Sequence, residues 1–183
     1  MEYRQESIHK YLISRGKKGD RQALNELYKL YAGAMFNICR RMTGDEEQAK
    51  DVLQDAFISV FSRLGSLKND EMFSAWIKRI VINHCLNELR KKKAFVEALD
   101  ENYDTAEYDT TVDQEFRTFE RNRLLQAIDQ LPEGCRTVLN LYVFEGYDHK
   151  EIGSILNITE SASKAQYSKA KRRLRQILVP KPI

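Results

Sequence analysis

Basic and polar side chains are concentrated in the last part of the chain. Between Glu160 and Ile183 there are seven Lys or Arg residues and one acidic residue. Lys and Arg pair with phosphate oxygens, and polar side chains form hydrogen bonds with base edges. The candidates for base or phosphate contacts are Lys164, Gln166, Tyr167 and Ser168, and the phosphate-pairing arginines are Arg172, Arg173 and Arg175. This pattern predicts binding of DNA, without covalent chemistry.

Two helices joined by a tight corner, within residues 147–178, would position these side chains. The apolar residues at helical spacing in the first helix are Ile152, Ile155 and Leu156. Gly153 leaves room for a second helix to cross closely, and Ile158 would fill the corner. Asn157 can adopt the left-handed conformation that ends a helix, and Thr159 is a good N-cap for the next one. The pattern predicts a helix-turn-helix that places its second helix in a DNA major groove. The alternative is a solvated basic helix that closes a helical bundle.

Length, charge and cysteine content limit the class of protein. The chain has 183 residues, a net charge of +3 and three widely spaced cysteines, with no CxxC pair. No apolar run approaches the length that spans a bilayer, and the first residues do not resemble a signal peptide. His9, His84 and His149 share no metal-ligand spacing. We therefore expect a cytoplasmic protein that is almost wholly helical, with no catalytic residue, no metal and no cofactor.

The remaining sequence divides into two helical lobes. Helical patterns predict helices at residues 8–18, 21–43, 45–64 and 73–93. Between Glu97 and Glu120 there are nine acidic residues and one basic residue, with few aliphatic ones. Such a segment buries little apolar area and is typical of a flexible linker. We predict an all-α protein with domains at residues 1–95 and 117–183, joined by an acidic linker at 96–116.

The predicted helix at residues 73–93 carries aromatic and basic residues together. Phe73 and Trp76 stand beside Lys78 and Arg79, and the basic character continues to Arg90. Exposed aromatic rings next to cations are typical of surfaces that bind single strands, because unstacked bases stack on the rings. The alternative is that both aromatic residues belong to the core and that the basic end is solvated.

With both lobes considered, the chain resembles a bacterial sigma factor of the extracytoplasmic-function (ECF) group. The resemblance covers nearly the whole chain and depends on three stretches in order: AKDVLQDAFISVFSRL (49–64), FSAWIKRIVINHCLNELRKKK (73–93) and LPEGCRTVLNLYVFEGYDHKEIGSILNITESASKAQYSKAKRRL (131–174). It implies two helical domains, called domain two and domain four, that bind core RNA polymerase and promoter DNA. At position 157 many relatives have Gly, whose backbone freedom Asn shares.

The resemblance also implies roles for particular residues. The surface that docks on the clamp helices of the largest polymerase subunit would contain Asp51, Val52, Gln54, Asp55, Phe57 and Ile58. The element that reads and opens the −10 region would contain Lys68, Asn69, Phe73, Trp76, Lys78, Arg79, Asn83, Asn87 and Arg90. The −35 element would be read by Thr159, Ser161, Ser163, Lys164, Gln166, Tyr167, Ser168, Lys171, Arg172 and Arg175. Further implied partners are the polymerase flap region and an anti-sigma factor, whereas residues 1–19 receive no role.

Two other classes of function remain open at this point. An ordinary transcriptional regulator could carry the same helix-turn-helix, but it need not bind core polymerase stably. A helical nuclease could use clusters of Asp and Glu, and its DNA cleavage would be sensitive to chelators. Promoter-specific initiation by core polymerase in the presence of the chain separates the sigma factor from both alternatives.

Overall fold

The computed structural model describes residues 2–96 and 114–178, with side chains from 8–91 and 122–178. The chain folds into two compact units, Met1–Glu101 and Asn102–Ile183. Within the described ranges every regular element is a helix and there is no strand, which confirms the predicted all-α fold. Most of the predicted acidic linker, residues 97–113, lies outside the described residues. No helix in the described ranges has the length and apolar character needed to cross a bilayer.

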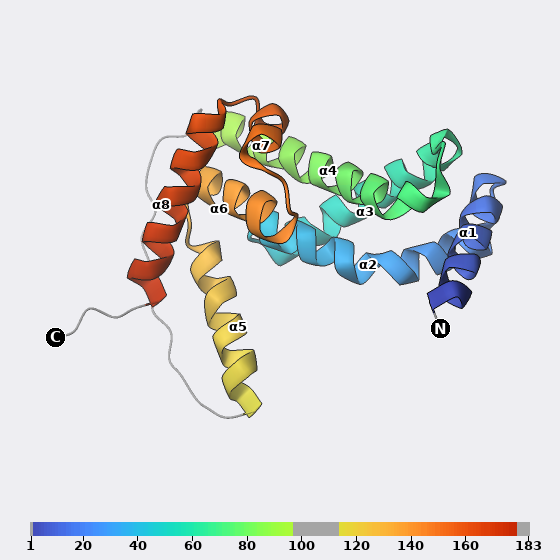
Figure 1. Ribbon diagram of the computed structural model, residues 1–183, viewed down its shortest axis with the longest axis horizontal. Coiled ribbons are helices and arrows are strands. Elements are labelled where there is room, and N and C mark those ends of the chain that lie inside the picture. Colours follow the sequence, from blue (N-terminus) through green and yellow to red (C-terminus); the bar gives the residue numbers. More distant parts are fainter. Residues whose placement is uncertain (1, 97–113, 179–183) are drawn as a thin grey trace. The chain divides into compact units, whose positions relative to one another are not determined.

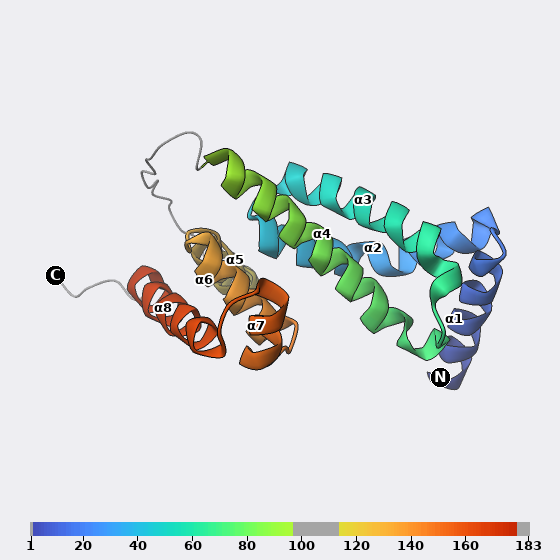
Figure 2. The same ribbon diagram turned by 90° about the horizontal axis from the view of Figure 1, so that it is seen from above.

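Unit 1 is a three-helix bundle with a fourth helix across one end (Figures 1 and 2). Its elements are α1 (Glu2–Lys17), α2 (Arg21–Thr43), α3 (Glu46–Arg63), the 3₁₀ turns η1 (Leu64–Ser66) and η2 (Asp70–Met72), and α4 (Phe73–Val96). In Figure 2, α2, α3 and α4 run side by side, and α1 crosses the end from which the η1–η2 loop projects. The loop therefore lies between the end of α3, the start of α4 and helix α1.

Polar caps and one glycine set the limits of these helices. The Asp20 carboxylate accepts hydrogen bonds from the backbone N–H groups of Gln22 and Ala23 at 2.9 and 3.2 Å. Gly44 ends α2 in the left-handed conformation, with φ of 77°. Asp45 then caps α3 by accepting from Gln48 N at 2.8 Å. These stops and starts were predicted from sequence, whereas α1 begins at Glu2 rather than at residue 8.

Apolar side chains from all four helices form the core of unit 1. Fully buried members come from each helix: Ile13, Leu27, Val60, Phe73, Ile77 and Val81. Each such side chain contributes about 1.5–3 kcal/mol of transfer free energy when it is removed from water. The core thus fixes which face of each helix remains available for binding.

Unit 2 packs three helical segments against its last helix (Figure 1). Its elements are α5 (Gln114–Asp129), α6 (Glu133–Leu139), the π-helix η3 (Asn140–Phe144), α7 (His149–Leu156) and α8 (Glu160–Leu178). A buried cluster joins the first part of the unit to α8: Ile128, Leu131, Cys135, Leu139 and Ala170, with Tyr167 and Leu174 at its edge. Consequently α8 has one side fixed against the unit.

The segment after α6 winds differently from an α-helix. Val138, Leu139 and Leu141 are buried. Tyr142 and Phe144 are 39% and 40% exposed. The reason is the π-helical winding from Asn140, because an i→i+5 turn rotates the following side chains away from the face that α-helical spacing would give them.

Candidate nucleic-acid interface

The helix-turn-helix of unit 2 is held by capping interactions at the start of α7 and at both ends of its turn. At the start of α7, Glu151 N donates to the Asp148 carboxylate and Asp148 N donates to the Glu151 carboxylate, both at 2.8 Å. Asn157 closes α7 with φ of 56° and ψ of 48°, and Thr159 Oγ1 accepts from Ala162 N at 3.0 Å to begin α8. These contacts confirm the predicted N-cap and the predicted left-handed residue. The orientation of α8 relative to α7 is therefore fixed by short local bonds.

Gly153 allows the chain to fold back tightly at this turn. A Cβ atom at this position would lie 2.9 Å from the backbone oxygen of Ile158. The space is thus occupied by the backbone of the turn and of the first residue of α8, whose N atom would lie 3.5 Å from that Cβ. Ile158, predicted to fill the corner, is 37% exposed, and its backbone N–H donates to Gly153 O at 3.0 Å.

Replacement of Gly153 by Ala is expected to destabilise unit 2 by about 1–3 kcal/mol, since an added methyl group would have to displace backbone rather than a flexible side chain. Thermal unfolding measures the loss. Ser154→Ala, at an exposed position one residue further on, is the matched control. Equal melting temperatures for the two variants would contradict the close approach seen here.

The side of α8 that faces away from the unit carries most of the predicted DNA-binding residues. Its exposed members are Ser161, Lys164, Ser168, Lys171, Arg172 and Arg175. Residues 161, 164, 168, 171, 172 and 175 recur at helical spacing, so they form one continuous face. Lys164 Nζ lies 2.6 Å from Glu160 Oε1, and this hydrogen bond lowers the pKa of the Glu160 carboxyl below its ordinary value. We call these six residues the basic face.

Three other predicted DNA contacts, Ser163, Gln166 and Tyr167, lie on the packed side of α8. Ser163 is completely buried, and its Oγ is hydrogen-bonded to His149 Nδ1 at 2.9 Å. A role for Ser163 in reading bases is therefore wrong, because its hydroxyl connects α7 and α8. The half-buried Gln166 accepts a hydrogen bond from the Cys135 thiol at 3.0 Å. Burial raises the pKa of this thiol, which keeps it protonated as the donor.

Tyr167 belongs to an aromatic group at the junction of η3, α7 and α8. Its ring centroid lies 4.6 Å from that of Tyr142 and 5.6 Å from that of His149. Tyr142 and His149 are themselves stacked at 4.5 Å with an interplanar angle of 11°. Lys171 Nζ lies 4.6 Å from the Tyr167 ring centroid. Tyr167 therefore supports the basic face through Lys171, and Thr159 is likewise occupied as the cap of α8.

In unit 1, five predicted residues share one side of α4. Trp76 is half-buried and the others are exposed. The five are Trp76, Arg79, Asn83, Asn87 and Arg90, and Arg90 donates to the Asn87 side-chain oxygen at 3.3 Å. At 100° per residue they fall within about a quarter of the helix circumference. Lys78 lies on the opposite side of α4 by the same geometry, so it does not share this face. The exposed Lys68 and Asn69 are in the loop that precedes the helix.

Phe73 does not belong to an exposed surface, although the sequence placed it there. Its side chain is fully buried, with the Tyr31 ring centroid at 5.0 Å and that of His9 at 5.6 Å. The Tyr31 hydroxyl is also hydrogen-bonded to His9 Nε2 and to Ser74 Oγ. The bulk of Phe73 thus joins α1, α2 and α4, and base stacking by this ring is excluded.

Burial lowers the pKa of His9 below its ordinary value, with Asp70 opposing part of this effect. The His9 imidazole therefore stays neutral in the folded unit at pH values where the same imidazole in the unfolded chain, whose pKa is about 6.5, is already protonated. We expect the free energy of unfolding of unit 1 to fall as the pH drops below about 6.5. Denaturant titrations at several pH values should show a weaker dependence for His9→Gln than for the wild type. Identical profiles would contradict a contribution from His9.

A third surface lies between α2 and α3. Asp51, Gln54, Asp55 and Ile58 are exposed on one side of α3, and Ile58 is 62% exposed. A groove of about 470 Å³ runs beside them and is lined by Tyr28, Lys50, Leu53, Gln54, Phe57, Ile58 and Phe61. We call this surface the α2–α3 groove. Val52, only 5% exposed, is a core residue, so its predicted docking role is wrong. Phe57 is 3% exposed and contributes a wall of the groove rather than an outward contact.

Family models identify the two units. Sigma-70 region 2 matches residues 27–95, and Sigma-70, region 4 matches residues 121–174. The ECF RNA polymerase sigma factor SigW of Bacillus subtilis is 30% identical over 183 residues, which cover 94% of this chain and 98% of SigW. The chain is an ECF sigma factor. It is therefore a promoter-recognising subunit of RNA polymerase, and its partners are the core enzyme and promoter DNA.

Other relatives agree with this assignment. The ECF RNA polymerase sigma factor SigM of Mycobacterium tuberculosis is 28% identical over 176 residues, covering 96% of this sigma factor and 87% of SigM. Among solved structures, the sigma factor RpoE from Bartonella quintana, crystallised with the anti-sigma factor NepR, matches with a TM-score of 0.59. The match has 18% identity and covers 86% of this chain and 98% of that one, so it supports the fold alone.

The sequence reading of the sigma factor missed part of the α2–α3 groove. Tyr28, Lys50, Leu53 and Phe61 all line it, yet none was predicted to. Their place at the groove depends on how α2 packs against α3, and helical periodicity carries no information about that angle.

Proposed function

We propose that the basic face of α8 binds the −35 element. Ser161, Lys164 and Ser168 lie on the first half of the helix and would meet base edges, while Lys171, Arg172 and Arg175 would pair with phosphates. The observation that carries this assignment is that these six exposed side chains share one side of the second helix of a helix-turn-helix. Gln166 and Tyr167, which pack toward the unit, would orient this face rather than read sequence.

We further propose that the loop between η1 and η2, with one side of α4, holds the separated strand of the −10 element. Lys68 and Asn69 are exposed on the loop, and Arg79 and Arg90 supply positive charge near the half-buried Trp76. Opening duplex DNA costs a few kcal/mol for each unstacked base, and capture of an extruded base on such a surface offsets part of that cost.

The proposed docking site for the clamp helices of core polymerase is the α2–α3 groove. Its exposed apolar side chain, Ile58, lies on the same side of α3 as the exposed acidic residues Asp51 and Asp55, so the surface offers both apolar area and charge. In unit 2, a consecutive exposed apolar stretch, Tyr142–Phe144, is the candidate contact for the flap region. Under this proposal the core enzyme supplies catalysis, and the sigma factor works as a non-catalytic specificity subunit in the cytoplasm.

An anti-sigma factor is a further proposed partner. The RpoE structure contains NepR. A second similar structure, CnrH in complex with the cytosolic domain of CnrY, matches this chain with a TM-score of 0.53 and 20% identity. A protein that covered Ile58 and the α2–α3 groove would compete directly with core polymerase. Such competition is a simple way to keep a sigma factor inactive.

Run-off transcription with core polymerase over a promoter library tests the function. We expect initiation only when the sigma factor is added, from start sites that share two upstream sequence elements. A chain that binds DNA but neither associates with core polymerase nor selects start sites would be an ordinary regulator. Chelator-sensitive cleavage of the templates would instead indicate a nuclease.

A further inference from the structure

We propose that helix α1 positions the strand-binding loop of this sigma factor, and that Lys17 is the residue through which it does so. The strand-binding loop is defined as residues 67–72, which comprise the connection between η1 and η2 together with η2 itself. The inference rests on the proposed role of that loop in holding the −10 strand, and it assigns a function to a helix that precedes both matched family regions.

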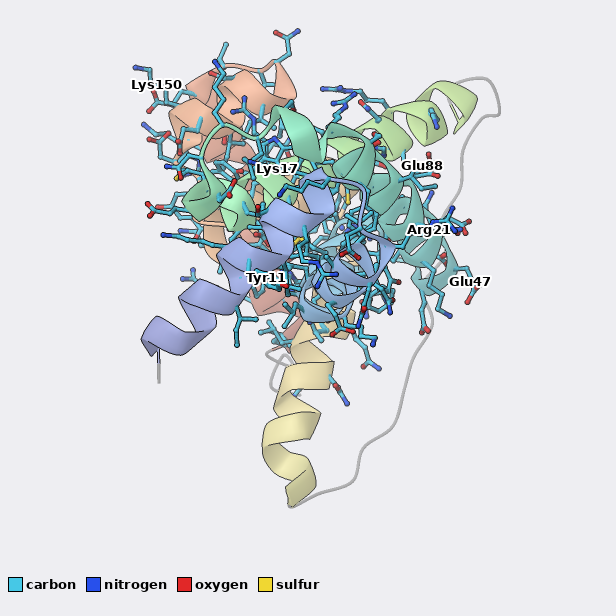
Figure 3. The ribbon with its side chains drawn as sticks, turned by 90° about the vertical axis from the view of Figure 1, so that its right-hand side faces the viewer. Tyr11, Lys17, Arg21, Glu47, Glu88 and Lys150 are labelled. Carbon is cyan, nitrogen blue, oxygen red and sulfur yellow. The ribbon has the colours of Figure 1, made fainter. Side chains whose placement is uncertain are left out.

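Lys17 makes two contacts with the loop from the last residue of α1. Its Nζ donates to the backbone oxygen of Leu67 at 2.8 Å and to Asp70 Oδ1 at 2.6 Å. Figure 3 labels Lys17 at this end of α1. The Lys17 and Asp70 side chains are 26% and 29% exposed, so water only partly competes for the pair. One ammonium group thus joins the start of the loop to η2.

The end of α1 lies close enough to the loop to hold Lys17 in place. A Cβ atom at Gly16 would lie 2.9 Å from Leu64 Cδ2 and 3.0 Å from Leu24 Cδ2, so the helix packs closely against η1. A second pair, Lys10 Nζ to Glu71 Oε1 at 2.9 Å, adds a more exposed contact further along the same helix. Helix α1 therefore supports the strand-binding loop over two of its turns.

The loop's own bonds are short-range. Leu67 N donates to Leu64 O and Met72 N donates to Asn69 O, both at 3.1 Å, while the Asn69 side chain accepts from Glu71 N at 3.0 Å. These bonds close two 3₁₀ turns, which are short elements with poor hydrogen-bond geometry. Between them, Lys68 and Asn69 are exposed. The Lys17 contacts span this exposed part, from Leu67 to Asp70, and so limit its conformations before DNA arrives.

Preorganisation of this kind should appear as affinity for the opened strand. If loss of Lys17 frees the backbone of one loop residue, strand binding has to order that residue again. The cost of ordering one residue corresponds to roughly 5- to 30-fold weaker binding. Contacts of the other unit with the −35 duplex and of the α2–α3 groove with core polymerase should not change.

The test uses holoenzyme assembled from the full chain and core polymerase. Its ligands are a fluorescent single-stranded oligonucleotide with the non-template −10 sequence and, separately, a −35 duplex, with sequences taken from the promoter library. Lys17→Met and Asp70→Asn each break the ion pair, and the second variant serves if the first folds poorly. Lys18→Met removes the same charge from the adjacent exposed residue. Lys68→Ala tests whether the loop binds the strand at all.

We expect Lys17→Met and Asp70→Asn to weaken binding of the −10 strand by roughly 5- to 30-fold, and to leave core affinity and −35 binding within about twofold of wild type. Lys18→Met should match the wild type. If Lys68→Ala weakens strand binding while the Lys17 and Asp70 variants do not, the positioning role is overturned and the loop site stands. If Lys68→Ala also has no effect, the loop site itself fails. An equal loss of −35 binding in the Lys17 and Asp70 variants would overturn the proposal as general destabilisation.

Discussion

Replacement of Lys171, Arg172 and Arg175 together by Gln is expected to weaken binding of the −35 duplex by roughly 100- to 1,000-fold at about 0.1 M salt. The three side chains are exposed within little more than one turn of α8, on the side that faces away from α6 and α7. Each Lys or Arg that pairs with a phosphate releases about 0.9 of a condensed counterion. Three lost contacts therefore reduce the slope of log K against log salt by about three.

The measurement is a titration of labelled −35 duplex with the sigma factor at several salt concentrations. The matched control is Lys18→Gln, Arg21→Gln and Lys29→Gln, which removes the same charge from exposed positions of unit 1. We expect the control to retain nearly all of the affinity and the salt slope. If both triple variants lose affinity equally, the long-range charge of the protein drives binding, and the basic face has no special role.

The limits of most helices could be predicted because they depend on local bonds. Asp20, Gly44 and Thr159 act within a few residues of their own positions, so the residue type alone indicates that each one ends or caps a helix. Asn157 is the clearest case, since its side chain tolerates the left-handed conformation that the turn requires. The start of α1 was missed because Glu2–Ser7 carries neither a cap nor a clear apolar stripe.

The exposed faces could be predicted only in part, because they depend on contacts between helices. Ser163 is of the same residue type as Ser161 and Ser168 on the same helix, but its hydroxyl is hydrogen-bonded to His149 on α7. Gln166 has the side chain of a base reader, yet Cys135 on α6 donates to it. Both partners are more than ten residues away, and no periodicity within α8 indicates them. A polar residue on a reading helix is therefore a candidate contact only after its neighbours have been placed.

The other large expected effect concerns core polymerase. Ile58→Asp should weaken the binding of core enzyme by about 2–4 kcal/mol, which corresponds to roughly 30- to 1,000-fold in affinity. Ile58 projects beside an apolar groove and is 62% exposed in the free protein. A contact that excludes water around it would bury its side chain next to Phe57 and Phe61. An aspartate there would have to lose its hydration against these rings without gaining a partner.

Leu30→Asp provides the control for this experiment. Leu30 is 58% exposed, so the same change is made at an equally accessible aliphatic residue. It follows Tyr28 by two residues on α2, which places it about 200° around the helix from the α2–α3 groove. Competition titrations against labelled wild-type sigma factor should separate the two variants, while −35 duplex binding remains equal in both. Loss of core affinity in Leu30→Asp but not in Ile58→Asp would place the polymerase on the opposite side of unit 1, because the groove would then be open to solvent in the holoenzyme.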